Sequence, residues 1–193
     1  MESVKEIVMR CIGVLKLDEN VIRKVIAEKE SFTYSIWITA ICALVPSFIF
    51  IMLFPFVFAF LLAVPILAII GSFIFVGIIY LFARIFGGKG SFISLYSIIG
   101  HAFAINILAF IPFIGMITMI WILVVLFKSL KIIFNFDTRK AILTIAMPFL
   151  LVIILSLTVY FGIRNVFNTL TNLSEINKGA SKNDEKVKDK NSY

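Results

Sequence analysis

The stretch Arg84-Ile85-Phe86-Gly87-Gly88-Lys89-Gly90-Ser91-Phe92 lies between two long apolar blocks and predicts a turn at a membrane surface. Upstream, residues 31–83 contain no charged side chain. Downstream, His101 is the only side chain in residues 90–127 that ionises near neutrality. A single helix through the first block would be about 80 Å long, whereas the hydrocarbon layer of a bilayer is about 30 Å thick. Each block must therefore fold back once, as a hairpin of two spans.

The composition places the whole chain among integral membrane proteins. Hydrophobic residues make up 61% and charged residues 15%, and the mean hydropathy is +1.08. In soluble globular proteins, charged residues make up about a quarter of the sequence. No secretory signal is visible, because the residues before the first apolar segment are rich in Lys, Arg and Glu. We expect the first span itself to direct insertion.

These patterns predict an all-α integral membrane protein with five transmembrane helices preceded by amphipathic interfacial helices. Pro55 and Pro112 divide the two blocks into hairpins, and a fifth apolar run contains Pro148. The carboxy-terminal tail is rich in Lys, Asn, Ser and Asp, a composition typical of disorder. The predicted segments are cytoplasmic helices in 1–30, a membrane domain in 31–163 with spans at about 33–53, 56–83, 92–111, 116–133 and 141–163, and a polar tail in 164–193.

The amino-terminal segment predicts two amphipathic helices that are too polar to span a membrane. Asp18 is placed to cap the second helix, which is expected from Glu19 to about Lys29. Two interpretations stay open for these helices: an interfacial anchor, or a docking face for a partner or for curved lipid. The predicted apolar faces consist of Val4, Ile7, Val8, Cys11, Ile12 and Leu15 in the first helix and Val21, Ile22, Val25 and Ile26 in the second.

The two cysteines are expected to lie in different environments. Cys11 precedes the membrane segments, whereas Cys42 lies inside the first apolar block. We therefore interpret both as small apolar residues and not as a disulfide framework or a metal site.

The distribution of Lys and Arg predicts a cytoplasmic amino terminus. Six Lys and Arg residues lie in residues 1–30, two lie in the hinge and four lie around the end of the fourth span. The two turns predicted on the other side of the membrane contain none. The six Lys and Arg residues of the tail oppose this rule, because five spans would place the tail outside, but they do not reverse the predicted orientation. Because the net charge of +7 is confined to segments flanking the spans, it indicates anchoring to anionic lipid and not nucleic-acid binding. The candidate partner or lipid face consists of Arg84, Lys89, Lys128, Lys131, Arg139 and Lys140.

No pattern of catalytic, cofactor-binding or metal-binding residues emerges. Lys89 does not belong to a phosphate-binding loop, because Ala83 and Gly90 stand where that motif requires Gly and Ser or Thr. His101 and Asn106 are the strongly polar side chains deep in the third span, about 140° apart on an α-helix. With no carboxylate in any span, a proton relay lacks a component, and we predict that both support interhelical packing.

Several motifs of this chain resemble those of the five-span Yip membrane proteins, which are named for interaction with Ypt/Rab-type GTPases. Gly87-Gly88-Lys89-Gly90-Ser91-Phe92 resembles the family's GGKGSF signature, and Gly100-His101-Ala102 resembles its Gly-Tyr/His-Ala segment. The spacing from Trp121 to Ala141, followed by Pro148, is also similar. The resemblance covers about residues 19–160 and is closest to prokaryotic-type members. Departures from the family pattern fall at Asp18-Glu19, Ile105 or Asn106, Ser129 and Phe134.

This resemblance implies a non-enzymatic role in membrane organisation or protein trafficking. The leading hypothesis is an adaptor in the plasma membrane of a prokaryote that binds an unidentified membrane or cytoplasmic protein, or anionic lipid, at its cytoplasmic face. An oligomer is compatible with this hypothesis. The alternative is a small permease or transporter component, which would need a polar cavity near the bilayer midplane.

Overall fold

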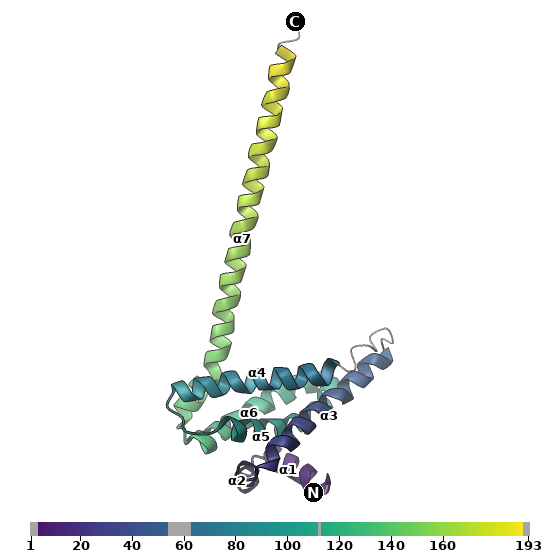
Figure 1. Cartoon of the computed structure of the whole chain (residues 1–193), viewed down its shortest axis with the longest axis vertical. Helices are drawn as coiled ribbons and strands as arrows, with labels where there is room; N and C mark the ends of the chain where they lie inside the picture. The colour runs from purple at the N-terminus through teal and green to yellow at the C-terminus, as the bar shows by residue number, and fades with distance from the viewer. Residues whose placement is uncertain (1–3, 54–62, 112, 191–193) are drawn as a thin grey trace. The chain divides into compact units, whose positions relative to one another are not determined.

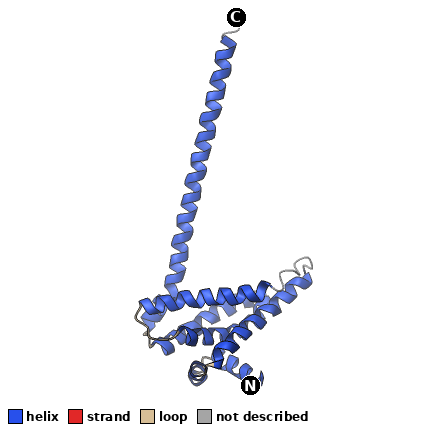
Figure 2. Cartoon of the chain, in the orientation of Figure 1, coloured by secondary structure: helices blue, strands red, loops and turns tan. Residues whose placement is uncertain are grey.

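The computed structural model describes residues 4–53, 63–111 and 113–190. The described residues form helices joined by short turns, without a strand among them (Figure 2). The chain divides into two compact units, Met1–Pro148 and Phe149–Tyr193. The elements are α1 (Val4–Leu15), α2 (Glu19–Ala27), α3 (Glu30–Leu53), α4 (Ala63–Ile85), α5 (Phe92–Ala102), the 3₁₀ helix η2 (Phe103–Phe110), α6 (Ile114–Phe134) and α7 (Thr138–Lys190). Figure 1 labels the α-helices.

Four segments of the described chain are long and apolar enough to cross a membrane: Ala63–Ile85, Phe92–Ala109, Ile114–Phe134 and Thr138–Thr169. In α3, the apolar segment within the described part is the shorter Glu30–Val45. The predicted turn at Pro55 and the residue Pro112 lie outside the described residues. The all-helical membrane fold is thus confirmed, and the count of five spans stays a prediction.

The third predicted span is a composite of two helix types. It runs as α5 to Ala102 and then continues as η2. A 3₁₀ helix rises about 2.0 Å per residue against 1.5 Å in an α-helix, so α5 and η2 together extend about 32 Å. This length covers a hydrocarbon layer of about 30 Å. The three-residue repeat of η2 aligns Phe103 with Asn106, which explains why both line one cavity.

Helices α3 and α5 run side by side in the same direction. The ring of Phe32 lies 5.3 Å from the ring of Tyr96, measured between centroids. One turn further along both helices, Gly100 packs against Ser35, where a Cβ on the glycine would collide with the serine side chain. Small residues allow helices to approach closely in lipid, where packing replaces the hydrophobic effect as the driving force.

Helix α4 runs in the opposite direction to α5. Tyr80, late in α4, lies 5.8 Å from Phe92 at the start of α5. Ser72, two turns earlier in α4, reaches Tyr96, and their hydroxyl oxygens are 2.9 Å apart. The ring of Phe134, at the end of α6, lies 6.2 Å from that of Tyr80. The alternation of direction from α3 to α6 is what two successive hairpins require.

The α1–α2 hairpin packs against α5 and α6. Its buried residues Val14, Ile22 and Val25 form one cluster with Ile98, Ala102 and Val125. The indole Nε1 of Trp121 donates to the carbonyl of Leu15 over 3.0 Å. Gly13 faces Val21 so closely that a Cβ would lie 2.7 Å from the valine side chain. Of the predicted apolar face of α1, Val4, Val8 and Ile12 are exposed.

The second unit begins at Phe149, inside α7, and is described by itself. Pro148 lies within α7 without ending it. The helix continues to Lys190, through the segment for which the sequence predicted a polar tail without ordered structure. Glu, Lys and Ala are good helix formers, so the composition of that segment permits the continuation. The boundary after residue 163 stays a prediction.

The close approach at Gly100 leads to a stability prediction with an internal control. Gly100→Ala should lower the stability of the purified protein by about 1–3 kcal/mol, because the methyl group overpacks the contact with Ser35. Gly77→Ala, in α4, should be neutral or stabilising, because a Cβ there meets nothing within 4 Å and Ala favours helix. Thermal unfolding in detergent measures both. Equal effects would contradict the close contact.

Candidate functional site

The hinge between α4 and α5 packs against the end of α6. Gly87 has φ of +84°, a conformation that glycine adopts without strain. A Cβ on Gly88 would lie 2.5 Å from the ring of Phe134, and a Cβ on Gly90 would collide with Ile133. The backbone N–H of Gly88 donates to the carbonyl of Ala83 over 2.9 Å. The glycines are therefore explained by a tight turn and a close contact with α6.

Lys128, one of the six predicted basic residues, joins α6 to α2. Its Nζ lies 2.5 Å from a carboxylate oxygen of Glu19. The hydrogen bond and the positive charge of Lys128 lower the pKa of the Glu19 carboxyl. The contact between Lys128 and Glu19 should weaken as the pH falls through the lowered pKa of Glu19, because protonation removes the negative charge of the carboxylate. Because the Glu19 side chain is exposed and that of Lys128 is partly exposed, we regard the pair as an orienting contact and not as a main source of stability.

Arg84 and Lys131 also have partners within the bundle. Nη1 of Arg84 donates to the carbonyl of Gly88 over 3.2 Å, which ties the end of α4 to the hinge. Nζ of Lys131 donates to the hydroxyl of Thr138 over 3.2 Å and so connects α6 to the start of α7. These two cations hold the turns in which they lie.

Lys89, Arg139 and Lys140 remain available at the same end of the bundle. All three are exposed, and within the described part of the chain their side chains form no ion pair or hydrogen bond. The backbone N–H of Lys140 donates to Oδ1 of Asp137 over 3.0 Å, which fixes the start of α7. The structure thus separates the predicted face into Arg84, Lys128 and Lys131, which bind within the bundle, and Lys89, Arg139 and Lys140, which do not.

His101 lies in a buried polar cluster between α5 and α3. Its Nδ1 is 2.7 Å from the carbonyl oxygen of Ser97 and 2.9 Å from Oγ of Ser35. A carbonyl oxygen can only accept, so this geometry assigns the proton to Nδ1. Oγ of Ser35 lies 2.6 Å from the same carbonyl and 2.8 Å from that of Ser31. Nε2 of His101 has no hydrogen-bond partner in the described part of the chain.

An ion pair that sequence reasoning missed lies next to this cluster. Arg10 in α1 pairs with Glu28, which follows α2, and its side chain is buried. Both charges are close enough to act electrostatically on His101. Helical spacing places Arg10 off the predicted apolar face of α1, and its partner lies beyond a turn, so the sequence pattern did not indicate this pair. The pair fixes the α1–α2 hairpin beside α3.

The prediction of different environments for Cys11 and Cys42 is wrong. Both thiols are buried and belong to one cluster with Ile38, because α1 packs against α3. Burial, together with the nearby thiol of Cys42, raises the pKa of Cys11 to about 11. A thiol with so high a pKa is protonated and weakly nucleophilic at neutral pH. The reading of Cys11 as a small apolar residue agrees with this environment.

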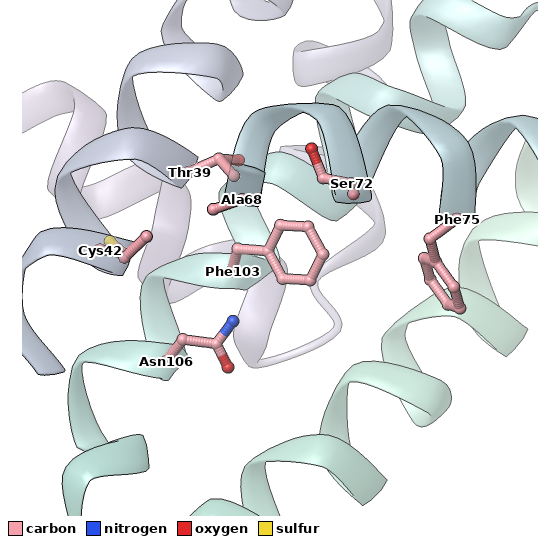
Figure 3. Close-up of a pocket in the computed structure, with 9 residues that line it drawn as sticks. Thr39, Cys42, Ala68, Ser72, Phe75, Phe103 and Asn106 are labelled. Carbon is pink, nitrogen blue, oxygen red and sulfur yellow. The ribbon is translucent and has the colours of Figure 1, made fainter. Parts of the chain in front are cut away.

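Asn106 lies away from His101, on a small cavity between α3, α4 and η2. The cavity holds about 170 Å³. Figure 3 shows Asn106 beside Phe103 of η2, with Thr39 and Cys42 from α3 and with Ala68, Ser72 and Phe75 from α4. The structure therefore places the two predicted polar residues in separate environments, and the packing role of each stays a prediction.

The described residues contain no group of three His, Cys, Asp or Glu side chains that could hold a metal ion. What the geometry defines is a bundle of apolar helices with buried polar contacts between helices and basic side chains at one end. Together with the spanning helices, this arrangement defines the chain as an integral membrane protein.

The comparison with protein families identifies the group to which the protein belongs. The sequence model of the Yip1 domain matches residues 12–160, well over half of the chain. The chain therefore belongs to the Yip1 domain family, which confirms the resemblance seen in the sequence. No curated protein and no solved structure matched the chain.

The contact between His101 and Ser35 can be tested by a double-mutant cycle. His101→Leu and Ser35→Ala should each destabilise the protein, and together they should cost less than the sum by about 0.5–1.5 kcal/mol. His101→Gln, which keeps a hydrogen-bonding side chain, should be tolerated better than His101→Leu. Thermal unfolding in detergent gives the values. Ser129→Ala is a control, because within the described part of the chain Ser129 bonds only to Val125 of its own helix. Additivity between His101 and Ser35 would refute the contact.

Proposed function

We propose that this Yip1 family protein is a non-enzymatic adaptor that recruits a protein partner to the basic end of its bundle. In this proposal the chain crosses the plasma membrane of a prokaryote five times with its amino terminus in the cytoplasm. The docking face comprises Lys89, Arg139 and Lys140. Arg84, Lys128 and Lys131 hold the surrounding turns.

The observation that carries this proposal is the difference in bonding among the six basic residues. Three have partners within the bundle, whereas Lys89, Arg139 and Lys140 are exposed and without one in the described part. Arg139 and Lys140 lie in the first turn of α7, where the helix dipole disfavours positive charge. Helix stability therefore does not explain them. Attraction to a negatively charged surface explains why Arg139 and Lys140 stand at this position.

The cavity at Asn106 supports the adaptor better than the permease alternative. Its volume of about 170 Å³ lies below the roughly 300–1,000 Å³ of typical small-molecule sites. Apolar side chains and small residues line most of it, with Asn106 and two hydroxyl groups as the polar exceptions. A cavity of this kind fits imperfect helix packing.

The proposed orientation predicts opposite accessibility of the two ends. In a variant with Cys11→Ala and Cys42→Ala, a single cysteine at Lys89 should be protected from a membrane-impermeant maleimide in sealed cells. A cysteine at Phe113, a residue 83% exposed before α6, should react. Permeabilised cells should label both and serve as the control. Labelling of both positions in sealed cells would overturn the orientation.

The docking proposal predicts that charge reversal at the start of α7 reduces partner recruitment. Arg139→Glu with Lys140→Glu should lower the amount of co-purified partner several-fold, since each charge contributes up to about 1 kcal/mol. Helix α7 should persist, because acidic residues are favoured in its first turn. Co-purification from native membranes, quantified by mass spectrometry, measures the effect.

Lys178→Glu with Lys182→Glu is the matched control, because it changes the net charge equally in the tail predicted to lie on the other side. This control should retain partners. Loss of partners only in the tail variant, or only on substitution of Phe113, would move the docking face to the opposite end of the bundle.

A further inference from the structure

A cleft opens between α1 and α2. It holds about 500 Å³, within the size range of sites that bind small molecules. The residues that line it are Lys5, Glu6, Met9, Arg10, Val21 and Lys24.

The charges around this cleft favour an anion. Lys5, Arg10 and Lys24 contribute three positive charges, against the carboxylate of Glu6 on the lining and that of Glu28, which pairs with Arg10. Arg10 is 5% exposed and is oriented by Glu28, whereas both lysines are exposed at the cleft. Because Arg10 is held by Glu28, the exposed ammonium groups of Lys5 and Lys24 are the cations that a phosphate group in the cleft can reach.

The surface of α1 beside the cleft is apolar and open. Val4 is 77% exposed and Met9, which also lines the cleft, 60%; Val8 and Ile12 are exposed as well. A free phosphate ion gains nothing from such a surface. A phospholipid places apolar chains next to its phosphate, so the combination of cations and exposed apolar residues matches an amphiphilic anion.

We propose that the α1–α2 cleft binds the headgroup of an anionic phospholipid. The phosphate lies between Lys5 and Lys24, and the acyl chains cover the exposed apolar residues of α1. Because the hairpin packs on α5 and α6, a bound lipid would hold it against the bundle as well as against the membrane. This proposal requires no protein partner, so it stands or falls independently of the docking proposal.

The test compares binding of two lipids to the full chain in neutral detergent. Dioleoylphosphatidylglycerol should bind more tightly than dioleoylphosphatidylcholine, as counted by native mass spectrometry and followed by thermal stability. Lys5→Glu with Lys24→Glu should weaken the phosphatidylglycerol affinity about tenfold or more and remove the preference. If this variant does not fold, Lys5→Gln with Lys24→Gln should show a smaller loss in the same direction.

Lys16→Glu with Lys29→Glu is the matched control, because both lysines are exposed on the same hairpin but lie outside the cleft. It should change the affinity less than about threefold. Equal losses in the two double variants would show that only general surface charge attracts the lipid, and would overturn the site.

Sodium phosphate at constant ionic strength separates the lipid from a free anion. Millimolar phosphate should displace little phosphatidylglycerol, because it lacks the apolar chains. Full displacement, or equal stabilisation by phosphate alone, would assign the cleft to a soluble anion and refute the lipid proposal. Val4→Ser with Val8→Ser should weaken lipid binding without changing the effect of phosphate.

Discussion

The contact between α5 and α3 at Gly100 and Ser35 is the constraint on which the rest of the bundle depends. Helix α5 is in contact with α1, α2, α3, α4 and α6, so its position fixes all of them. In lipid, apolar surfaces gain little from leaving the solvent, and helices associate through close packing and hydrogen bonds. The missing side chain of Gly100 allows the backbone of α3 to approach, and this approach brings Ser35 within bonding distance of His101.

The lipid environment also explains why the polar side chains of the spans contribute to packing. An unsatisfied hydroxyl costs several kcal/mol in hydrocarbon, so the hydroxyls of Thr39, Ser129 and Thr144 donate to carbonyls one turn earlier in their own helices. The contacts of His101 with Ser35, and of Ser72 with Tyr96, cross between helices instead. These cross-helix contacts give the bundle specific pairings that apolar side chains alone would leave loose.

The sequence predicted those features that depend on the order of residues along the chain. Uncharged segments of span length and the glycines of the hinge are local patterns, and the structure shows a left-handed Gly87 in that hinge. The 3₁₀ segment after Ala102 was not predictable in this way, because it contains no proline or glycine and its register follows from its packing. The proximity of Cys11 to Cys42 likewise depends on how α1 packs against α3.

The candidate site was predictable only in its composition. Counting Lys and Arg indicates which end of a bundle faces the cytoplasm, but it treats each charge as equivalent. The contact of Lys128 with Glu19 and that of Arg84 with Gly88 show that some of these charges hold helices and turns together. A cation with an internal partner has lost part of its attraction for an outside anion, whereas an exposed cation without one keeps it. The distinction between anchoring and recruiting charges therefore comes from the partners that folding provides.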